Sequence, residues 1–406
     1  MKRNVLFILS GYPAASSPTD LAAEPVIRDL RRDHNVFCLT RRGAGRPAHE
    51  TVDGVEIFRV REHLLAGRKG GVCRALTALR FRITQLLTIP LYPKVTPFFE
   101  RRFCRKALSV CRDKKIDTVI SVCFPPEAVA AGYYVKKKLP DIIFVPYMID
   151  AYACGTLPKF LPRSFTAKKL AARERRWIDA ADRVIAMPAS REFREKTFGD
   201  EKTRYLNPAF LSAPPRETEQ TDGILEKDRI NVLFTGYLYL PDRDPGYVIR
   251  ALDREDVCLI FVGKDRVGDL WDRVSFKGTL KHIGFMPHEK LAGLLAGADV
   301  LLNMGVSNSR AISGKIFEYM AFGKPILTTY FKEDDAALAY LARYPLSCTL
   351  DQTRLTAEEA AERFDAFVRE TSGKQVPFET VRELFYDSTP EAFTEEIKTL
   401  WQGETE

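Results

Sequence analysis

The sequence predicts an α/β protein of two domains, each built around a parallel, doubly wound sheet. Short apolar runs typical of buried strands alternate with segments of helical periodicity along the chain, which is the pattern of a parallel sheet covered by helices. This alternation stops at a polar, proline-containing stretch, 212–229, and then starts again. A length of 406 residues is sufficient for two or three domains.

The first half opens with an expected strand at 4–9. The N-terminal MKRNVLFILSGYP has a charged start like that of a signal peptide, but its apolar run covers only 5–9 and no small-residue cleavage site follows. No run in the chain approaches the ~20 apolar residues that a membrane span needs. Further strands are expected at 35–40, 55–60, 117–122, 142–148 and 182–187, and helices at 24–32 and 167–181.

The loop at 10–20, SGYPAASSPTD, follows the first strand and would therefore lie at the carboxyl edge of its sheet, where α/β proteins bind ligands. The alternative is an ordinary connection between a strand and a helix. The loop lacks the G-x-G-x-x-G pattern, so the sequence does not indicate a bound dinucleotide.

A carboxylate, Glu174, falls inside the apolar stripe of the helix at 167–181. Carboxylates are rarely buried without a partner. We expect an ion pair with an arginine, and the alternative is that Glu174 opens into a cleft.

The eight cysteines form no C-x-x-C pair, and most of them lie in apolar runs. They are therefore expected to be reduced core thiols of a cytoplasmic protein, without a disulfide role. His282 and His288 lack a third ligand at metal-site spacing, so no metal site is expected either.

The net charge of +8 is concentrated in one region. Residues 59–115 contain 15 lysines and arginines against three acids, an excess of twelve positive charges that leaves about −4 for the remainder. Cations interleaved with aromatic and aliphatic residues suit an anionic membrane surface, which would place the protein in the cytoplasm or on the inner face of the membrane. The alternative is ordinary sheet-covering helices with a solvated basic face. No nucleic-acid recognition motif accompanies the region, so no nucleic-acid partner is expected.

The second half repeats the architecture without repeating the sequence. Gly236 and Gly263 end its first two expected strands, where a glycine lets a ligand approach the backbone closely. The strands are expected at 230–236, 258–263, 282–285, 299–304 and 325–329, and helices at 356–370 and 390–401.

The stretch NMGVSNSRAISGKIFEYMAFGKPILTT is the part of the chain most suggestive of a site. It predicts a short helix that is capped by Ser313 and stopped at Gly323. Amides at Ser313 and Gly314 would point outward from the helix start, an arrangement that binds phosphate. Lys315 and Glu318 are three residues apart and would project together, the lysine toward a diphosphate and the carboxylate toward ribose hydroxyls. The alternative is a solvated ion pair on an ordinary amphipathic helix.

The motif GKIFEYMAFGKPIL resembles the nucleotide-sugar motif of glycosyltransferase family 4, and the resemblance continues upstream through GFMPHEKLAGLLAGADVLLN. It implies the GT-B fold, with two facing Rossmann-like domains, an interdomain cleft and a C-terminal helix that crosses back to the first domain. The implied parts are an acceptor domain at 1–211, a linker at 212–229, a nucleotide-sugar donor domain at 230–385 and the crossover helix at 386–406.

The resemblance also implies roles for single residues. Glu318 matches the carboxylate that holds the donor ribose, and Phe285 and Met286 match positions that cover the base. Asp150 ends a predicted strand where the family often has an aspartate, and we expect it to position the acceptor; a turn former or helix cap is the alternative. Lys315, with the amides before it, would stabilise charge on the leaving diphosphate.

The sequence departs from the family's pattern at two places. Tyr237 stands where many members have an arginine that touches the diphosphate, and Arg243 would replace a lysine a few residues later. Arg310 stands eight residues before Glu318, where the fuller motif has a carboxylate that contacts the donor sugar. An arginine cannot accept hydrogen bonds, but it suits a carboxylate or phosphate. An acidic donor sugar would explain the departure.

The expected function is therefore transfer of a sugar from a nucleotide-diphosphate donor to a glycan or lipid-linked acceptor in polysaccharide or glycolipid assembly. The resemblance implies retention of configuration, without a metal ion or other cofactor. One alternative is a nucleotide-sugar 2-epimerase on the same fold. Another is a catalytically silent binding protein, for which Arg310 and Tyr237 are the best arguments.

Overall fold

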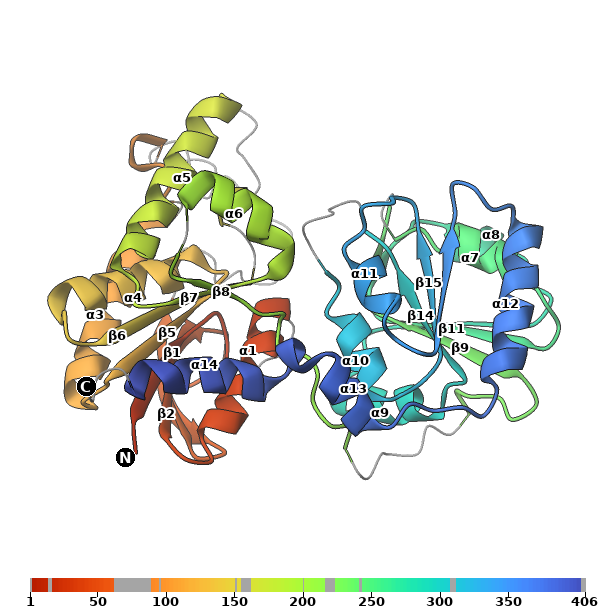
Figure 1. Ribbon diagram of the computed structural model, residues 1–406, viewed down its shortest axis with the longest axis horizontal. Coiled ribbons are helices and arrows are strands. Elements are labelled where there is room, and N and C mark those ends of the chain that lie inside the picture. The colour runs from red at the N-terminus through yellow and green to blue at the C-terminus, as the bar shows by residue number, and fades with distance from the viewer. Residues whose placement is uncertain are drawn as a thin grey trace. The chain divides into compact units, whose positions relative to one another are not determined.

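The chain forms two compact α/β units (Figure 1). The computed structural model describes residues 2–13, 17–61, 89–94, 96–149, 152–154, 162–199, 201–215, 223–240, 243–306 and 312–402. Unit 1 comprises Met1–Ala209 together with Pro390–Glu406, and unit 2 comprises Phe210–Thr389. The chain therefore leaves unit 1 once and returns to it with its last helix.

Unit 1 is built on an eight-stranded sheet with the order β3-β4-β2-β1-β5-β6-β7-β8. All neighbouring pairs are parallel except β3 and β4. The order reverses between β1 and β5, which is the topological switch point where doubly wound sheets bind ligands. The strands are β1 (Asn4–Ile8), β2 (Asn35–Arg42), β3 (His49–Val52), β4 (Val55–Arg61), β5 (Thr118–Cys123), β6 (Ile143–Met148), β7 (Val184–Ala186) and β8 (Thr203–Tyr205).

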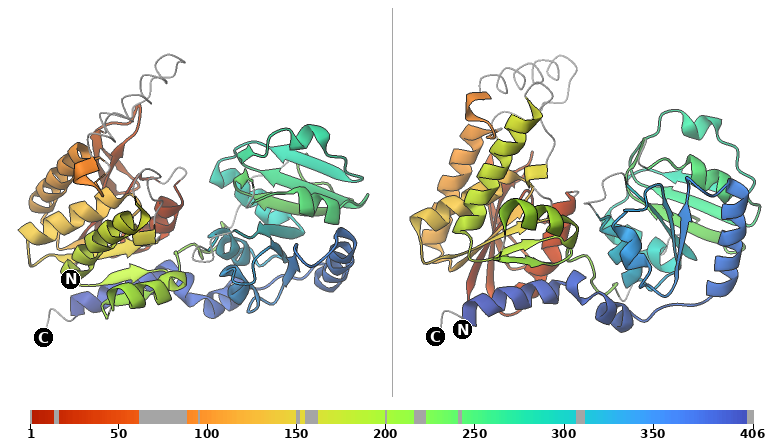
Figure 2. Two further views of the ribbon diagram at one scale, coloured as in Figure 1. Left: turned by 90° about the horizontal axis from the view of Figure 1, so that it is seen from above. Right: turned by 45° about the horizontal axis from the view of Figure 1, so that its top comes forward.

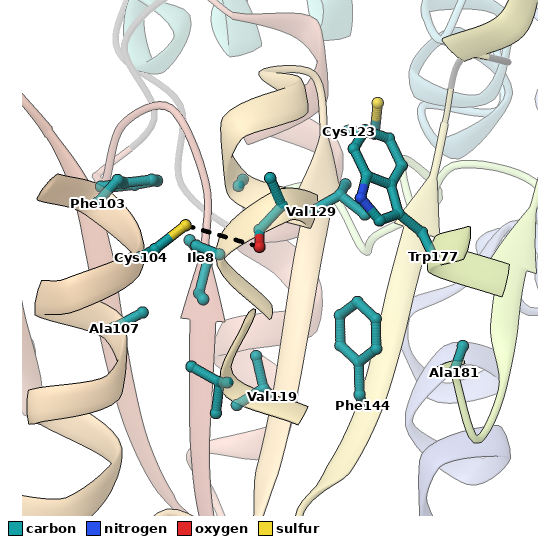
Figure 3. Close-up of a cluster of buried hydrophobic side chains, with 14 of the residues drawn as sticks. Ile8, Phe103, Cys104, Ala107, Val119, Cys123, Val129, Phe144, Trp177 and Ala181 are labelled. Carbon is teal, nitrogen blue, oxygen red and sulfur yellow. Dashed lines mark hydrogen bonds between the residues drawn. The ribbon is translucent and has the colours of Figure 1, made fainter. Parts of the chain in front are cut away.

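Helices cover both faces of this sheet. Helices α3 (Pro97–Asp113), α4 (Pro126–Lys138) and α5 (Arg163–Ala180) share one core with it. Figure 3 shows this core, where Phe103 and Trp177 from the helices meet Val119 and Phe144 from the strands. Successive strand residues point to opposite faces, so Thr118 faces the other layer, which contains α1 (Pro18–Leu30) and α14 (Pro390–Gln402).

The final helix, α14, lies against α1 and the sheet of unit 1 (Figure 1). Trp401 is 8% exposed, and its Nε1 donates a hydrogen bond to Thr118 Oγ1 at 2.9 Å. Phe393 packs edge-to-face on Tyr147 with 4.6 Å between ring centroids. These contacts confirm the expected return of the C-terminal helix to the first domain.

Unit 2 is built on a six-stranded, wholly parallel sheet with the order β13-β11-β9-β14-β15-β16. Its strands are β9 (Ile230–Thr235), β11 (Val257–Val262), β13 (Thr279–Ile283), β14 (Val300–Met304), β15 (Ile326–Tyr330) and β16 (Ser347–Asp351). Its helices are α7 (Gly246–Ala251), α8 (Leu270–Arg273), α9 (His288–Gly297), α10 (Lys315–Ala321), α11 (Ala337–Leu341), α12 (Ala357–Thr371) and α13 (Phe378–Leu384). The order reverses between β9 and β14, so the switch point of unit 2 lies there.

The sequence predictions of a doubly wound α/β fold are confirmed, with local corrections. Helix α1 begins at Pro18, six residues before the expected start, because proline is tolerated in a first helical turn. Strand β13 ends at Ile283 rather than continuing to 285. Strand β3 was not expected, although Asp53 and Gly54 both have positive φ and form the tight turn that an Asp-Gly pair favours.

The predicted ion pair of Glu174 with an arginine is confirmed, and the arginine is Arg194. The two side chains are fully buried, and Arg194 Nη1 donates to Glu174 Oε1 at 2.6 Å. The other carboxylate oxygen accepts from the backbone N–H of Ala153 at 2.8 Å. Glu174 thus joins α5 to α6 (Arg191–Phe198) and to the segment after β6.

Within the described parts of the chain, Cys38, Cys104, Cys111, Cys123, Cys258 and Cys348 form no disulfide, and all of these except Cys348 are buried. Burial raises the pKa of Cys104 to about 12, so this group stays a thiol near neutral pH. Its Sγ donates to the carbonyl of Ala130 at 3.7 Å (Figure 3). Within the described ranges, no helix is long and apolar enough to cross a membrane.

We predict that the docking of α14 contributes strongly to the stability of unit 1. Trp401→Ala should lower the free energy of unfolding by ~3–5 kcal/mol through lost packing. Trp401→Phe should lower it by ~1–2 kcal/mol, because Thr118 loses a buried donor. Urea denaturation followed by circular dichroism checks this, with exposed Glu395→Ala in the same helix as the control. Equal midpoints for Trp401→Ala and the wild type would contradict the prediction.

Candidate functional site

The carboxyl edge of the unit 2 sheet brings several of the predicted site residues together. Strand β9 ends at Thr235 and is followed by Gly236, and β14, its neighbour across the switch point, leads to α10. Helix α10 carries Lys315 and Glu318. Segments about eighty residues apart in sequence therefore meet at the place where parallel sheets bind ligands.

Helix α10 begins one residue later than expected. Its N-cap is Gly314, and Ser313 lies before the helix, so the prediction that Ser313 caps it is wrong. The Ser313 carbonyl nevertheless accepts from the N–H of Ile316 at 3.2 Å. A Cβ on Gly314 would lie 2.2 Å from the Phe210 ring, so glycine is needed here for packing. The expected end of the helix is confirmed, with Gly323 at φ 68° after the last turn.

Lys315 and Glu318 form an ion pair that is partly shielded from water. Lys315 Nζ lies 2.8 Å from Glu318 Oε2, with the side chains 30% and 14% exposed. The pair is therefore partly shielded from water. Burial opposes the charged form of Lys315, but the Glu318 carboxylate outweighs it and raises the pKa of the lysine above its ordinary value. The ammonium group thus stays protonated near neutral pH.

Arg243 lies beside the start of α10, although it is 70 residues away in sequence. Its Nη2 donates to Ser313 Oγ and its Nη1 to the Tyr237 carbonyl, both at 3.5 Å. A Cβ on Gly236 would stand 3.5 Å from the same guanidinium. Arg243 also opposes the charge of Lys315, so the two cations lie near each other and share one site.

The two strand-end glycines lie against each other. Gly263 has φ 142°, and a Cβ there would lie 1.8 Å from the carbonyl oxygen of Gly236. Gly236 itself has φ 152°. Position 263 therefore needs a glycine because the backbone of Gly236 comes so close to it. The sequence analysis had attributed this need to the approach of a ligand.

Tyr319, which the sequence did not single out, holds α10 in place. Its buried hydroxyl accepts from the N–H of Thr235 at 3.0 Å and lies 3.1 Å from the Thr235 Oγ1. Because Thr235 precedes Gly236 and Tyr319 follows Glu318, this contact fixes the ion pair relative to the end of β9. A tyrosine in an otherwise apolar helix face was the available signal.

Phe285 and Met286 follow β13 at the same edge of the sheet. Phe285 is 61% exposed, whereas Met286 packs partly against the core. Lys264 Nζ lies 5.4 Å from the Phe285 ring centroid, and Arg266 lies 5.9 Å from that of Tyr237. The exposed ring of Phe285 offers a flat apolar face with a cation beside it, which suits a planar aromatic ligand.

Two residues of the sequence hypothesis, Asp150 and Arg310, lie outside the residues that the structure describes. At the switch point of unit 1, Asp20 is 3% exposed and accepts from the N–H of Ser10 at 3.0 Å. Thr19 Oγ1 donates to the Phe124 carbonyl at 3.0 Å. The start of α1 is thus tied to both strand ends that flank the switch point.

The fold is GT-B. A sucrose-phosphate synthase from Thermosynechococcus elongatus matches 100% of this chain and 99% of its own, with a TM-score of 0.63 and 14% identity. A glycosyltransferase from Rickettsia africae matches 99% of this chain and 98% of its own, with a TM-score of 0.65 and 12% identity. A UDP-GlcNAc 2-epimerase from Methanocaldococcus jannaschii matches 98% of this chain and 100% of its own, with a TM-score of 0.52 and 10% identity. No protein-family model and no curated protein sequence matches the chain.

We predict a pH effect on stability from Asp20. Burial raises its pKa from 3.8 to about 6, so the folded state binds this proton more tightly than the unfolded chain does. The free energy of unfolding should therefore fall as the pH rises through that interval, by roughly 3 kcal/mol. Asp20→Asn should remove this contribution. Denaturation midpoints between pH 4 and 7.5 check it.

Burial also raises the pKa of Asp335 in unit 2, so the wild-type pH profile contains more than one contribution. The difference between the profiles of the wild type and Asp20→Asn isolates the contribution of Asp20. A wild-type pH profile parallel to that of Asp20→Asn would show that Asp20 titrates normally.

Proposed function

We propose that the chain is a glycosyltransferase of the retaining, family 4 type. It would move a sugar from a nucleotide-diphosphate donor to a glycan or lipid-linked acceptor, in polysaccharide or glycolipid assembly. The observation that carries this proposal is the cluster of Arg243, Ser313, Lys315 and Glu318 at the switch point of unit 2. The GT-B fold supports it.

The cluster has the chemistry of a diphosphate site. Arg243 and Lys315 supply two cations against one carboxylate. Of the first N–H groups of α10, that of Ile316 already donates to the Ser313 carbonyl, so the two cations are the main phosphate donors. The Lys315 ammonium has three donors, of which one is directed to Glu318. The others would contact phosphate oxygens. As the bond from sugar to phosphate breaks, charge grows on the diphosphate and these groups stabilise it.

Glu318 would accept hydrogen bonds from the ribose hydroxyls, since an ionised carboxylate is a pure acceptor. Phe285 would lie against the base, and Met286 would line the same place. Gly236 and Gly263 keep the backbone between base and diphosphate free of side chains. Asp150 would position the acceptor. This mechanism uses neither a metal ion nor a protein nucleophile, because the leaving diphosphate itself assists the acceptor.

The replacement of the family's arginine by Tyr237 does not remove the second cation. The Arg243 guanidinium reaches the Tyr237 carbonyl, and so stands next to the position from which that arginine would extend. Its planar fork can hold two phosphate oxygens at once. Arg310 would favour an acidic donor sugar.

A nucleotide-sugar 2-epimerase is the second candidate. Its support is the match to two such enzymes, from Listeria monocytogenes (putative) and M. jannaschii, at TM-scores of 0.57 and 0.52. An epimerase would interconvert two nucleotide sugars without an acceptor. A transferase would release the nucleoside diphosphate only when it passes the sugar on.

We predict that one nucleoside diphosphate among UDP, GDP, ADP and TDP stabilises the protein. At 100 times its dissociation constant, it should add ~2.7 kcal/mol to the free energy of unfolding, which raises Tm by about 5–10 °C. Glu318→Ala should abolish this shift, because the ribose loses its acceptor. The matched control is Glu333→Ala, whose carboxylate is 69% exposed and pairs with Arg354 elsewhere in unit 2.

A Tm shift that persists in Glu318→Ala would show that the nucleotide binds at another site. The absence of any shift at millimolar concentration would favour the catalytically silent binding protein.

With the nucleotide identified, we predict that Lys315→Met reduces kcat by about 10²–10³, as expected for removal of one donor to a developing anion. Donor turnover can be followed by NMR with and without a glycan or polyprenyl-phosphate acceptor. The control is Lys290→Met, an exposed lysine of unit 2. Conversion of the donor into an isomeric nucleotide sugar, without free diphosphate, would show that the protein is an epimerase.

A further inference from the structure

Three exposed apolar side chains lie on η1, α3 and α5 of unit 1. The described chain exposes five large apolar residues, and three of them are Leu91 at 51%, Phe98 at 71% and Phe165 at 46%. Leu91 ends η1 (Ile89–Leu91), and Phe98 and Phe165 lie in the first turns of α3 and α5. Such side chains are individually ordinary on a surface, but a group of them on neighbouring elements indicates an interaction site.

One arginine holds these elements together. Arg173 of α5 donates to the Pro93 carbonyl at 3.1 Å and to Glu100 of α3 at 2.6 Å. Lys94 completes the group at 3.2 Å from Glu100. The segment that bears Leu91, the first turns of α3 and helix α5 therefore form one preformed surface.

Chain direction places this surface at the carboxyl edge of the sheet. Helix α3 leads directly into the amino end of β5, and α5 into the amino end of β7. Both helices therefore begin at the opposite, carboxyl edge, and Figure 2 shows their first turns at the same end of unit 1. The switch point of unit 1 lies at this edge.

The charges of the surface are almost entirely positive. Phe98, Arg101, Arg102 and Arg105 are exposed and lie at helical spacing on one side of α3. In the first seven residues of α5, the exposed cations are Arg163, Lys168 and Lys169. Within the ranges described, no acid lies at ion-pair distance from any of these six cations. Residues 91–106 and 162–173 contain nine lysines and arginines and a single acid, the buried Glu100.

We propose that this surface, formed by 91–94, 96–105 and 163–169, docks on an anionic lipid bilayer. Leu91, Phe98 and Phe165 would enter the headgroup and acyl boundary, while the guanidinium and ammonium groups contact lipid phosphates. Nucleic acid would use the cations but would gain little from three apolar side chains that project between them. Docking needs neither donor nor transfer, so it stands or fails separately from the proposed function.

We predict that the full-length protein co-sediments with vesicles of 30% phosphatidylglycerol in phosphatidylcholine at 50 mM NaCl, and only weakly with pure phosphatidylcholine. The triple variant Arg101→Glu, Arg102→Glu, Arg105→Glu should bind at least about tenfold more weakly, because each cation near the surface contributes to binding. Phe98→Ser with Phe165→Ser should also weaken binding, and this part of the loss should persist at 300 mM NaCl.

Matched controls come from unit 2. Arg250→Glu, Lys290→Glu and Lys374→Glu change the same charge at exposed sites, and Leu240→Ser removes an apolar side chain that is 53% exposed. Both should bind like the wild type, with circular dichroism showing that every variant is folded.

Three outcomes would overturn the proposal. They are no binding of the wild type to anionic vesicles, equal losses in the unit 2 controls, and binding to a DNA or RNA duplex as tight as to vesicles and unaffected by loss of the two phenylalanines.

Discussion

The geometry of the candidate site depends on the hydrogen bond between Tyr319 and Thr235. Helix α10 has only seven residues, too few to be stable by itself, so its position is set by tertiary contacts. Its apolar side lies in the core of unit 2, but an apolar contact leaves freedom to slide and turn. The buried hydroxyl removes that freedom because its partners among the described residues all belong to Thr235, at the end of β9. Lys315 and Glu318 then stand next to Gly236 and Arg243 as a consequence.

The sequence predicted what is local or periodic. Alternating strands and helices gave both doubly wound sheets, and the spacing of Lys315 and Glu318 gave their contact, because residues three apart on a helix are neighbours whatever the rest of the chain does. The predicted N-cap at Ser313 was wrong by one residue, because the helix begins after Gly314, which packs against the Phe210 ring. Phe210 is about a hundred residues away in sequence, so no local pattern could predict this contact.

Contacts between distant segments were harder to predict. That Glu174 would find an arginine followed from burial, but the choice of Arg194 depends on how α6 packs on α5. Arg243 became a candidate only through resemblance, because its contact with Ser313 joins segments that are 70 residues apart. The Asp-Gly turn before β4 was a local signal that was overlooked.

The two units differ in how their cations are used. In unit 2, Lys315 is paired and partly shielded, and Arg243 is held by hydrogen bonds. Fixed charges of this kind recognise a defined ligand, because little reorganisation is needed when it binds. The six exposed cations of the proposed docking surface of unit 1 are long, have no acid at ion-pair distance within the described ranges, and are interleaved with apolar side chains. Flexible charges suit a surface without fixed geometry, such as a layer of lipid headgroups.

This difference also bears on the silent binding protein. A chain that had lost catalysis would need no shielded lysine at the switch point of unit 2, because a membrane or glycan could be held by unit 1 alone. Keeping Lys315 charged while it is partly buried costs desolvation, which Glu318 offsets. Such an arrangement contributes little to folding that an apolar pair would not supply. It is more readily explained by a ligand that carries its own negative charge and its own hydroxyl groups, as a nucleoside diphosphate does.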